Sequence, residues 1–316
     1  MISVAKQTQA RSAPQSSAVD ARALQRLENL KGVILLEGSV HGSELANAVG
    51  RSILELPVID GLSVLDLWRR EIADLACFIG VGPLPCRLLL GHGSRPPVLS
   101  PRDVEAGITV ERDCSEFRGT GGALRDLLAD EDDSAQYIVA GAAQVLFEPL
   151  HLLAMQIAAK GGDVSLVTYD DGSPSNLSLI QQRAMKNIPA AGFVDLKEKG
   201  LAIMAATHHV TVLRRPRATS APLRSLQEYI AALRGYHRAI CGRNTQHEPF
   251  EERWSSTFSI VEPGAAVESG ARVHDSVVLS GGRVGAGSLL VHSLVAGSGS
   301  IPPGRRLTGA IVNTSL

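Results

Sequence analysis

Residues 32–58 read GVILLEGSVHGSELANAVGRSILELPV. The apolar run Val33–Leu36 predicts a buried strand, and Gly38 ends it. A strand that runs into a glycine-containing loop is where doubly wound α/β folds place their ligands. The stretch therefore predicts an α/β domain with a ligand site at the end of this strand.

The whole chain has the composition of a soluble globular protein. It has 316 residues, enough for two domains, with 44% apolar and 20% charged residues. A net charge of −1 does not indicate binding to nucleic acid or to an acidic membrane. No apolar run is long enough to span a bilayer. The four cysteines show no metal-ligand spacing, which favours reduced thiols in a cytoplasmic protein.

The first 18 residues are Ser-rich and basic and lack the apolar core of a secretory signal. We expect a disordered tail here, and an organellar transit peptide is the alternative. An α/β domain with an N-terminal helix is expected over residues 19–240, followed by a polar linker over 241–257.

In the last segment, residues 258–316, the spacing of the apolar residues along the sequence changes. Aliphatic residues recur there at steps of six or five, with glycine and small residues between them. Such a hexapeptide repeat predicts a short left-handed parallel β-helix, in which small residues fit the corners. The recurring positions are Val261, Val267, Val273, Val278, Val284, Leu290, Val295, Ile301 and Leu307. An acyltransferase with a catalytic His274 or His292 is an alternative, although such enzymes use a longer array.

A second glycine-rich stretch, Phe117–Arg125, reads FRGTGGALR and is expected to open a helix. It resembles the LGTAGAL-like loop of the sugar-1-phosphate nucleotidyltransferase family, and residues 32–58 resemble that family's opening strand and loop. Members often carry a C-terminal hexapeptide-repeat domain as well. The resemblance spans about residues 30–316. It implies a Rossmann-like nucleotidyltransferase domain followed by the β-helix.

The resemblance also implies where a nucleotide and a sugar would bind. The nucleotide side would be formed by Leu36, Gly38, Gly119, Thr120, Gly121 and Gly122. Residues 190–195, AAGFVD, resemble the family's N-A-G-I-Y-V segment, which implies that Gly192 lies on the sugar side.

The residues that carry the family's chemistry are replaced here. Residues 37–45, EGSVHGSEL, lack its Thr-Arg pair, and Arg51 is the only candidate for its catalytic Lys. In the implied register, Gln144 and Pro222 stand where two Asp residues would hold Mg²⁺. A neutral amide is a poor ligand for that ion, and a proline side chain is none.

Two hypotheses about function follow. One is a noncatalytic relative, without a cofactor, that binds a nucleotide or sugar nucleotide or pairs with a catalytic homologue as a regulator or scaffold. The other is an active Mg²⁺-dependent enzyme that makes a nucleoside diphosphate sugar with a reorganised site drawn from Glu37, Glu44, Glu148 or Asp195. We also expect a homo-oligomer formed through the β-helix, because the open end of its coil leaves an unpaired edge.

Overall fold

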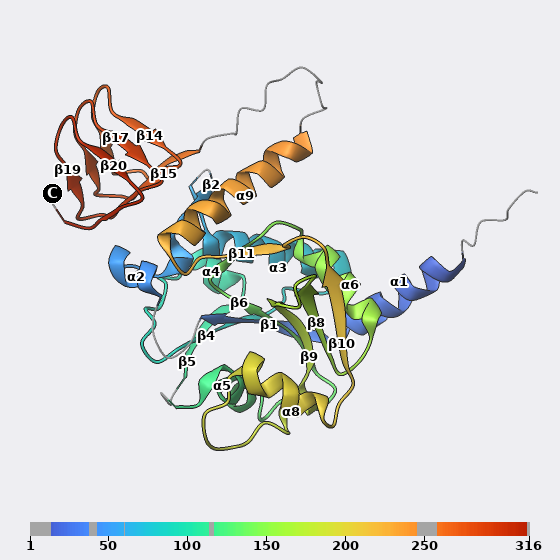
Figure 1. The fold of residues 1–316 in the computed structure, drawn as a ribbon. Coiled ribbons are helices and arrows are strands. Elements are labelled where there is room, and N and C mark those ends of the chain that lie inside the picture. Colours follow the sequence, from blue (N-terminus) through green and yellow to red (C-terminus); the bar gives the residue numbers. More distant parts are fainter. Residues whose placement is uncertain (1–13, 38–42, 60, 114–116, 245–257, 315–316) are drawn as a thin grey trace, which may run out of the picture.

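The computed structural model describes residues 14–37, 43–59, 61–113, 117–244 and 258–314. These residues form an α/β domain followed by a smaller C-terminal domain of short strands (Figure 1). Among them, no helix is long and apolar enough to cross a membrane.

A seven-stranded sheet forms the centre of the α/β domain, in the order β10-β8-β9-β6-β1-β4-β5. All of its pairings are parallel except those of β9, which runs antiparallel to both β6 and β8. The predicted strand Val33–Leu36 forms the middle of β1. The seven strands are β1 (Leu30–Glu37), β4 (Cys86–Leu90), β5 (Ile108–Arg112), β6 (Gln136–Gly141), β8 (Val164–Tyr169), β9 (Pro174–Gln181) and β10 (Val210–Arg215).

Helices cover both faces of this sheet (Figure 1). Because successive side chains of a strand point to opposite faces, Val33 and Leu35 join one hydrophobic cluster and Ile34 joins the other. The first face packs against α1 (Pro14–Leu27), α3 (Val64–Ile79), α6 (Leu150–Lys160) and α9 (Leu226–Asn244). The second face packs against α5 (Gly119–Leu127), α7 (Gln182–Met185), the π-helix η2 (Leu196–Gly200) and α8 (Leu201–Ala205).

Helix α3 shows how local sequence sets an element in place. Ser63 caps it in a reciprocal capping box with Asp66, and Gly80 ends it in the left-handed conformation. Its apolar face is buried, and the Trp68 indole Nε1 donates to the Ala142 carbonyl at 3.0 Å. Trp68 therefore anchors α3 to the chain just after β6.

Two predicted boundaries differ from the observed elements. Helix α1 begins at Pro14, inside the segment predicted as a disordered tail. Helix α9 continues to Asn244, inside the predicted linker, since residues 241–244, CGRN, contain no proline to interrupt it.

Short segments connect the layers. The hairpin β2 (Pro57–Ile59) and β3 (Leu62–Ser63) precedes α3, and β7 (Gln144–Leu146) pairs antiparallel with β11 (Ser220–Pro222). The remaining short helices are α2 (Glu44–Val49), η1 (Ile53–Glu55) and α4 (Pro101–Glu105).

The C-terminal domain consists of three small parallel sheets, with strand orders β12-β15-β18-β21, β13-β16-β19 and β14-β17-β20. Every paired residue lies 17 positions further along the chain, which equals two steps of six and one of five. This arrangement is compatible with the predicted β-helix, whose left-handedness stays a prediction. The strands are β12 (Ser259–Val261), β13 (Ala266–Val267), β14 (Arg272–His274), β15 (Ser276–Val278), β16 (Arg283–Val284), β17 (Leu289–Val291), β18 (Leu294–Val295), β19 (Ser300–Ile301), β20 (Arg306–Thr308) and β21 (Ile311–Val312).

The repeat positions are buried unevenly. Val278, Val284 and Leu290 are fully buried between coils, whereas Val261 and Val267 are exposed. Strands β12 and β13 lie in the first coil and pair on one side only. The first coil therefore presents apolar side chains and an unpaired strand edge.

The C-terminal domain lies against the α/β domain beside α2, β2 and α9 (Figure 1). Phe258 stacks on His237 of α9 with ring centroids 5.5 Å apart, and Asn313 donates to the Ala48 carbonyl of α2. The same hydrophobic cluster runs from the sheet into Val277 and Leu294. The two domains thus share a continuous apolar core at their contact.

Candidate functional site

A cavity of about 370 Å³ lies at the carboxyl ends of β1 and β6, beside the first residues of β9. This is the edge of the sheet at which the sequence predicts a ligand. Predicted site residues Leu36 and Thr120 line it, as do Asp195 and Pro222. Gly38 lies outside the described residues, and Gly192 is not among the lining residues.

The glycine-rich stretch does form the start of a helix, but its amides are already used. Gly119 has φ +68°, and a Cβ there would lie 2.6 Å from the Val194 carbonyl oxygen, so only glycine fits. Gly121 and Gly122 both donate their N–H groups to that same carbonyl, at 2.9 and 3.3 Å. These N–H groups hold the segment before η2 in place rather than point into open space.

Thr120 and Asp195 form a closed hydrogen-bond network at the cavity wall. Thr120 Oγ1 donates to Asp195 Oδ2 at 2.9 Å and accepts from the Leu196 N–H. The other carboxylate oxygen, Oδ1, accepts from the N–H groups of Lys197 and Glu198, and so caps η2. Both oxygens of Asp195 are therefore engaged in building the wall.

The two positions at which the family resemblance implies metal ligands are neighbours in space. Gln144 of β7 and Pro222 of β11 are directly paired across the antiparallel ladder. Gln144 is buried, and its Nε2 donates to the Asn176 carbonyl at 3.2 Å; Ala143, not Gln144, lines the cavity. In the part of the chain that the structure describes, no group of three or more His, Cys, Asp or Glu residues could hold a metal ion. Gln144 and Pro222 therefore do not fit Mg²⁺, which proteins usually hold through one or two carboxylates.

The other carboxylates considered for a reorganised site are dispersed. Glu148 is engaged by Arg215, whose Nη2 lies 2.5 Å from each carboxylate oxygen. Glu44 is exposed in the first turn of α2. Glu37, next to Leu36 on β1, does not line the cavity and accepts a hydrogen bond from the Ser52 hydroxyl. Asp195 is the one carboxylate among the described cavity residues.

Glu37 is a buried carboxyl group at the end of the central strand. Burial raises its pKa to about 7, against the opposing effects of hydrogen bonds from Ser52 and Ser94 and of the charge on Arg112. Its Oε2 is buried without a hydrogen-bond partner. A charged carboxylate at this point of the sheet is therefore costly above neutral pH.

We expect Glu37→Gln to stabilise the protein at pH 8 and to have little effect at pH 5. The unfolded carboxyl loses its proton near pH 4.5 and the folded one near pH 7, so stability falls as pH rises between these values. The penalty at pH 8 is about 3 kcal/mol, and glutamine cannot ionise. Urea unfolding of both proteins at the two pH values measures it. The exposed Glu44→Gln serves as control, and an equal effect of Glu37→Gln at both pH values would contradict the assignment.

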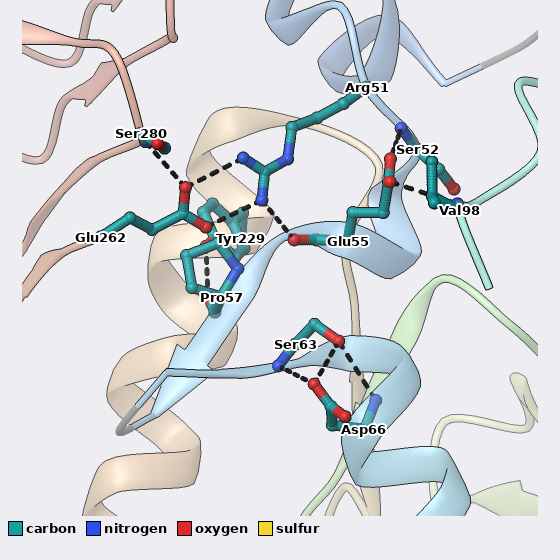
Figure 2. Close-up of polar contacts among 10 residues, drawn as sticks. All are labelled: Arg51, Ser52, Glu55, Pro57, Ser63, Asp66, Val98, Tyr229, Glu262 and Ser280. Carbon is teal, nitrogen blue, oxygen red and sulfur yellow. Dashed lines mark hydrogen bonds and ion pairs between the residues drawn. The ribbon is translucent and has the colours of Figure 1, made fainter. Parts of the chain in front are cut away.

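Arg51, the candidate catalytic cation, contacts the C-terminal domain instead of the cavity (Figure 2). Its Nη1 and Nη2 donate to the two carboxylate oxygens of Glu262 at 2.9 and 2.8 Å, and Nη2 also donates to the Glu55 carbonyl. Glu262 in turn accepts from the Ser280 N–H. The bidentate geometry joins η1 to the first coil.

Two cations that sequence reasoning did not assign to the site line the cavity, Lys197 and Arg224. The Lys197 ammonium donates to Asn176 Oδ1. Although Lys197 is an exposed residue, desolvation by the surrounding protein lowers its pKa, with Asp195 opposing this and Arg224 adding to it. The sequence offered one clue to both cations, since each lies two residues after a position that the family resemblance had pointed out. Lys197 follows the segment AAGFVD, residues 190–195, and Arg224 follows Pro222.

Comparisons with known proteins find similarity only at the level of structure. No protein-family model matches the sequence, and no curated protein matches it. A solved structure described as a "putative glucose-1-phosphate thymidylyltransferase" from Bacillus anthracis, in complex with sucrose, shares 13% identity. Its match covers 69% of this chain and 97% of the other, with a TM-score of 0.48. HddC from Yersinia pseudotuberculosis, complexed with GMP-PN, shares 12% identity over 65% of this chain and 98% of its own, with a TM-score of 0.43. These similarities concern the fold alone and assign no activity.

Proposed function

We propose that this protein is a noncatalytic, cytoplasmic relative of the sugar-1-phosphate nucleotidyltransferases that binds a nucleotide or sugar nucleotide in the cavity beside β1, β6 and β9. The observation that carries the proposal is the composition of this cavity. Its wall combines apolar side chains with hydroxyl, amide and cationic groups, as small-molecule sites do, while its one carboxylate among the described residues caps η2 through Oδ1 and accepts from Thr120 at Oδ2.

The cavity is large enough for part of such a ligand. A volume of about 370 Å³ lies in the range of ligand pockets. Leu36, Val139 and Leu166 supply an apolar surface for a ring, and Ser175 and Asn176 supply polar groups. The Ser175 hydroxyl is buried without a hydrogen-bond partner. Because buried polar groups are rarely left unpaired, a bound ligand is a natural partner for it.

Calorimetric titration tests this function. We expect binding of at least one nucleoside diphosphate hexose from a panel that carries each common base. Leu36→Trp, which fills the cavity from β1, should abolish the binding heat while leaving the circular dichroism spectrum unchanged. Leu152→Trp, at an exposed position on α6, is the matched control. A complete absence of binding across the panel would reject the proposal.

We further propose self-association, or pairing with a catalytic homologue, through the first coil of the C-terminal domain. The exposed Val261 and Val267 lie on strands with one unpaired edge, and such edges favour association. Light scattering at micromolar concentration should show an oligomer, and the double variant Val261→Lys with Val267→Lys should be a folded monomer. A wild-type monomer with no co-purifying homologue would count against this assembly.

A further inference from the structure

Two cationic side chains are among the residues that line the cavity. Lys197 lies in the first turn of η2, and Arg224 follows β11; both line the cavity, and the charge of Arg224 helps to lower the pKa of Lys197. The nearby Asp195 carboxylate already accepts three hydrogen bonds, two at Oδ1 and one at Oδ2. Two positive groups thus converge where the family resemblance implies a divalent cation.

We infer that Lys197 and Arg224 form an anion subsite that holds the phosphate groups of the ligand directly, without a divalent metal ion. The inference rests on the proposed function, since it names how the same cavity would recognise a phosphorylated ligand. A phosphate ester carries oxygens that accept charge-assisted hydrogen bonds from both ammonium and guanidinium groups.

The state of the two cations supports this assignment. Desolvation lowers the pKa of Lys197, so the surrounding protein does not fully compensate its charge. Its hydrogen-bond acceptor is the neutral Asn176 amide oxygen. The Asp195 charge raises its pKa in part, but no ion pair joins the Lys197 ammonium to a carboxylate of the described residues. A bound phosphate would supply the missing counter-charge.

Arg224 contributes less, for two reasons. Its side chain is 74% exposed, and Glu228 in the first turn of α9 pairs with it at 2.7 Å. An exposed ion pair is weak, so the guanidinium can share its donors with a ligand. We therefore assign Lys197 the larger part of the binding.

Metal coordination at this point is disfavoured by the same groups. Gln144 and Pro222 supply no anionic oxygen, and a divalent cation placed beside Lys197 and Arg224 would be repelled by both. Phosphate recognition by two side-chain cations is therefore the arrangement that the cavity's charges favour.

Titration with nucleoside diphosphate hexoses, each in excess chelator and again in excess Mg²⁺, tests the subsite. We expect the dissociation constant to agree within about twofold between the two conditions. Lys197→Gln should weaken binding roughly tenfold, the size of one lost charge-assisted contact. Lys199→Gln, an exposed lysine on the same η2 that does not line the cavity, should leave binding unchanged.

The Arg224 pair provides a second comparison. Arg224→Gln should weaken binding about threefold, as expected for a largely exposed charge. Glu228→Gln removes the competing carboxylate and keeps the cation, so it should leave binding equal or tighter. Equal loss in both variants would show that the ion pair, rather than the cation, matters.

The outcomes separate this inference from the proposed function. Strictly Mg²⁺-dependent binding, or a parent nucleoside that binds as tightly as its diphosphate hexose, would overturn the subsite while ligand binding itself stands. Inorganic pyrophosphate bound in chelator and lost in Lys197→Gln, with no nucleotide bound, would support the subsite and reject the nucleotide function. Absence of binding by every probe would reject both.

Discussion

Pyrophosphate release from nucleoside triphosphate, hexose 1-phosphate and Mg²⁺ should proceed at no more than about one thousandth of an ordinary enzyme rate. The transition state of phosphoryl transfer places negative charge on phosphate oxygens, and an active site must stabilise that charge. Gln144 and Pro222 supply no anionic metal ligand, and Asp195 is used to cap η2. Losing one preorganised charge-stabilising group costs about 3–4 kcal/mol, or roughly 10²–10³ in rate.

The geometry of Arg51 strengthens this expectation. Its guanidinium pairs with Glu262 outside the cavity, so it does not replace a catalytic lysine in the observed arrangement. Arg51→Ala should therefore leave any residual rate unchanged. A coupled pyrophosphate assay across the common triphosphates and sugar phosphates, with an active thymidylyltransferase as positive control, measures the rate. Turnover at ordinary rates that a chelator abolishes would establish the active-enzyme alternative.

The sequence predicted the elements whose cause is local. Val33–Leu36 forms a central strand because an uninterrupted apolar run is buried on both faces, and the six-and-five spacing matches the 17-residue register of the C-terminal strands. Gly119 was singled out through the resemblance of FRGTGGALR to a nucleotide-binding loop, whereas in the structure its backbone closely approaches another backbone segment. Its partner, the Val194 carbonyl, lies far along the chain and could not be inferred.

The predicted site residues were incomplete for a related reason. Sequence patterns identify positions that resemble a family, whereas the cavity also takes residues from segments brought in by packing. Lys197 and Arg224 belong to no recognised motif position, and they reach the cavity through η2 and β11. Likewise, the sequence placed Arg51 as a catalytic candidate by its position near the opening loop, but its partner Glu262 comes from the other domain.

Asp275, a buried carboxylate that follows β14, forms hydrogen bonds at the contact between the two domains. Its Oδ1 accepts from the Phe258 N–H at 3.0 Å, and its Oδ2 accepts from Arg234 Nε of α9 at 2.8 Å. Burial raises its pKa, but the hydrogen bonds from Arg234 and Phe258 outweigh this, so the net shift is downward. A lowered pKa means that the carboxylate stabilises the folded state above its unfolded value of 3.8 and loses this effect as pH falls through the folded value.

Asp275→Ala should destabilise the C-terminal domain and its contact with α9 by about 3 kcal/mol at pH 7. The change removes charge-assisted hydrogen bonds, leaves the buried Phe258 N–H without its acceptor, and puts alanine at φ +42°, which favours Asp, Asn or Gly. Asp275→Asn keeps an acceptor and tolerates that backbone conformation, so it should cost about 1–2 kcal/mol. Urea unfolding and hydrogen exchange of the amides in β12–β21 measure both effects.

Glu268→Ala, which removes only an exposed hydrogen bond to the Ala286 N–H, is the control and should cost less than either. If hydrogen exchange in these strands stays at the wild-type rate in Asp275→Ala, the two domains are held together by their shared apolar core and not by this carboxylate.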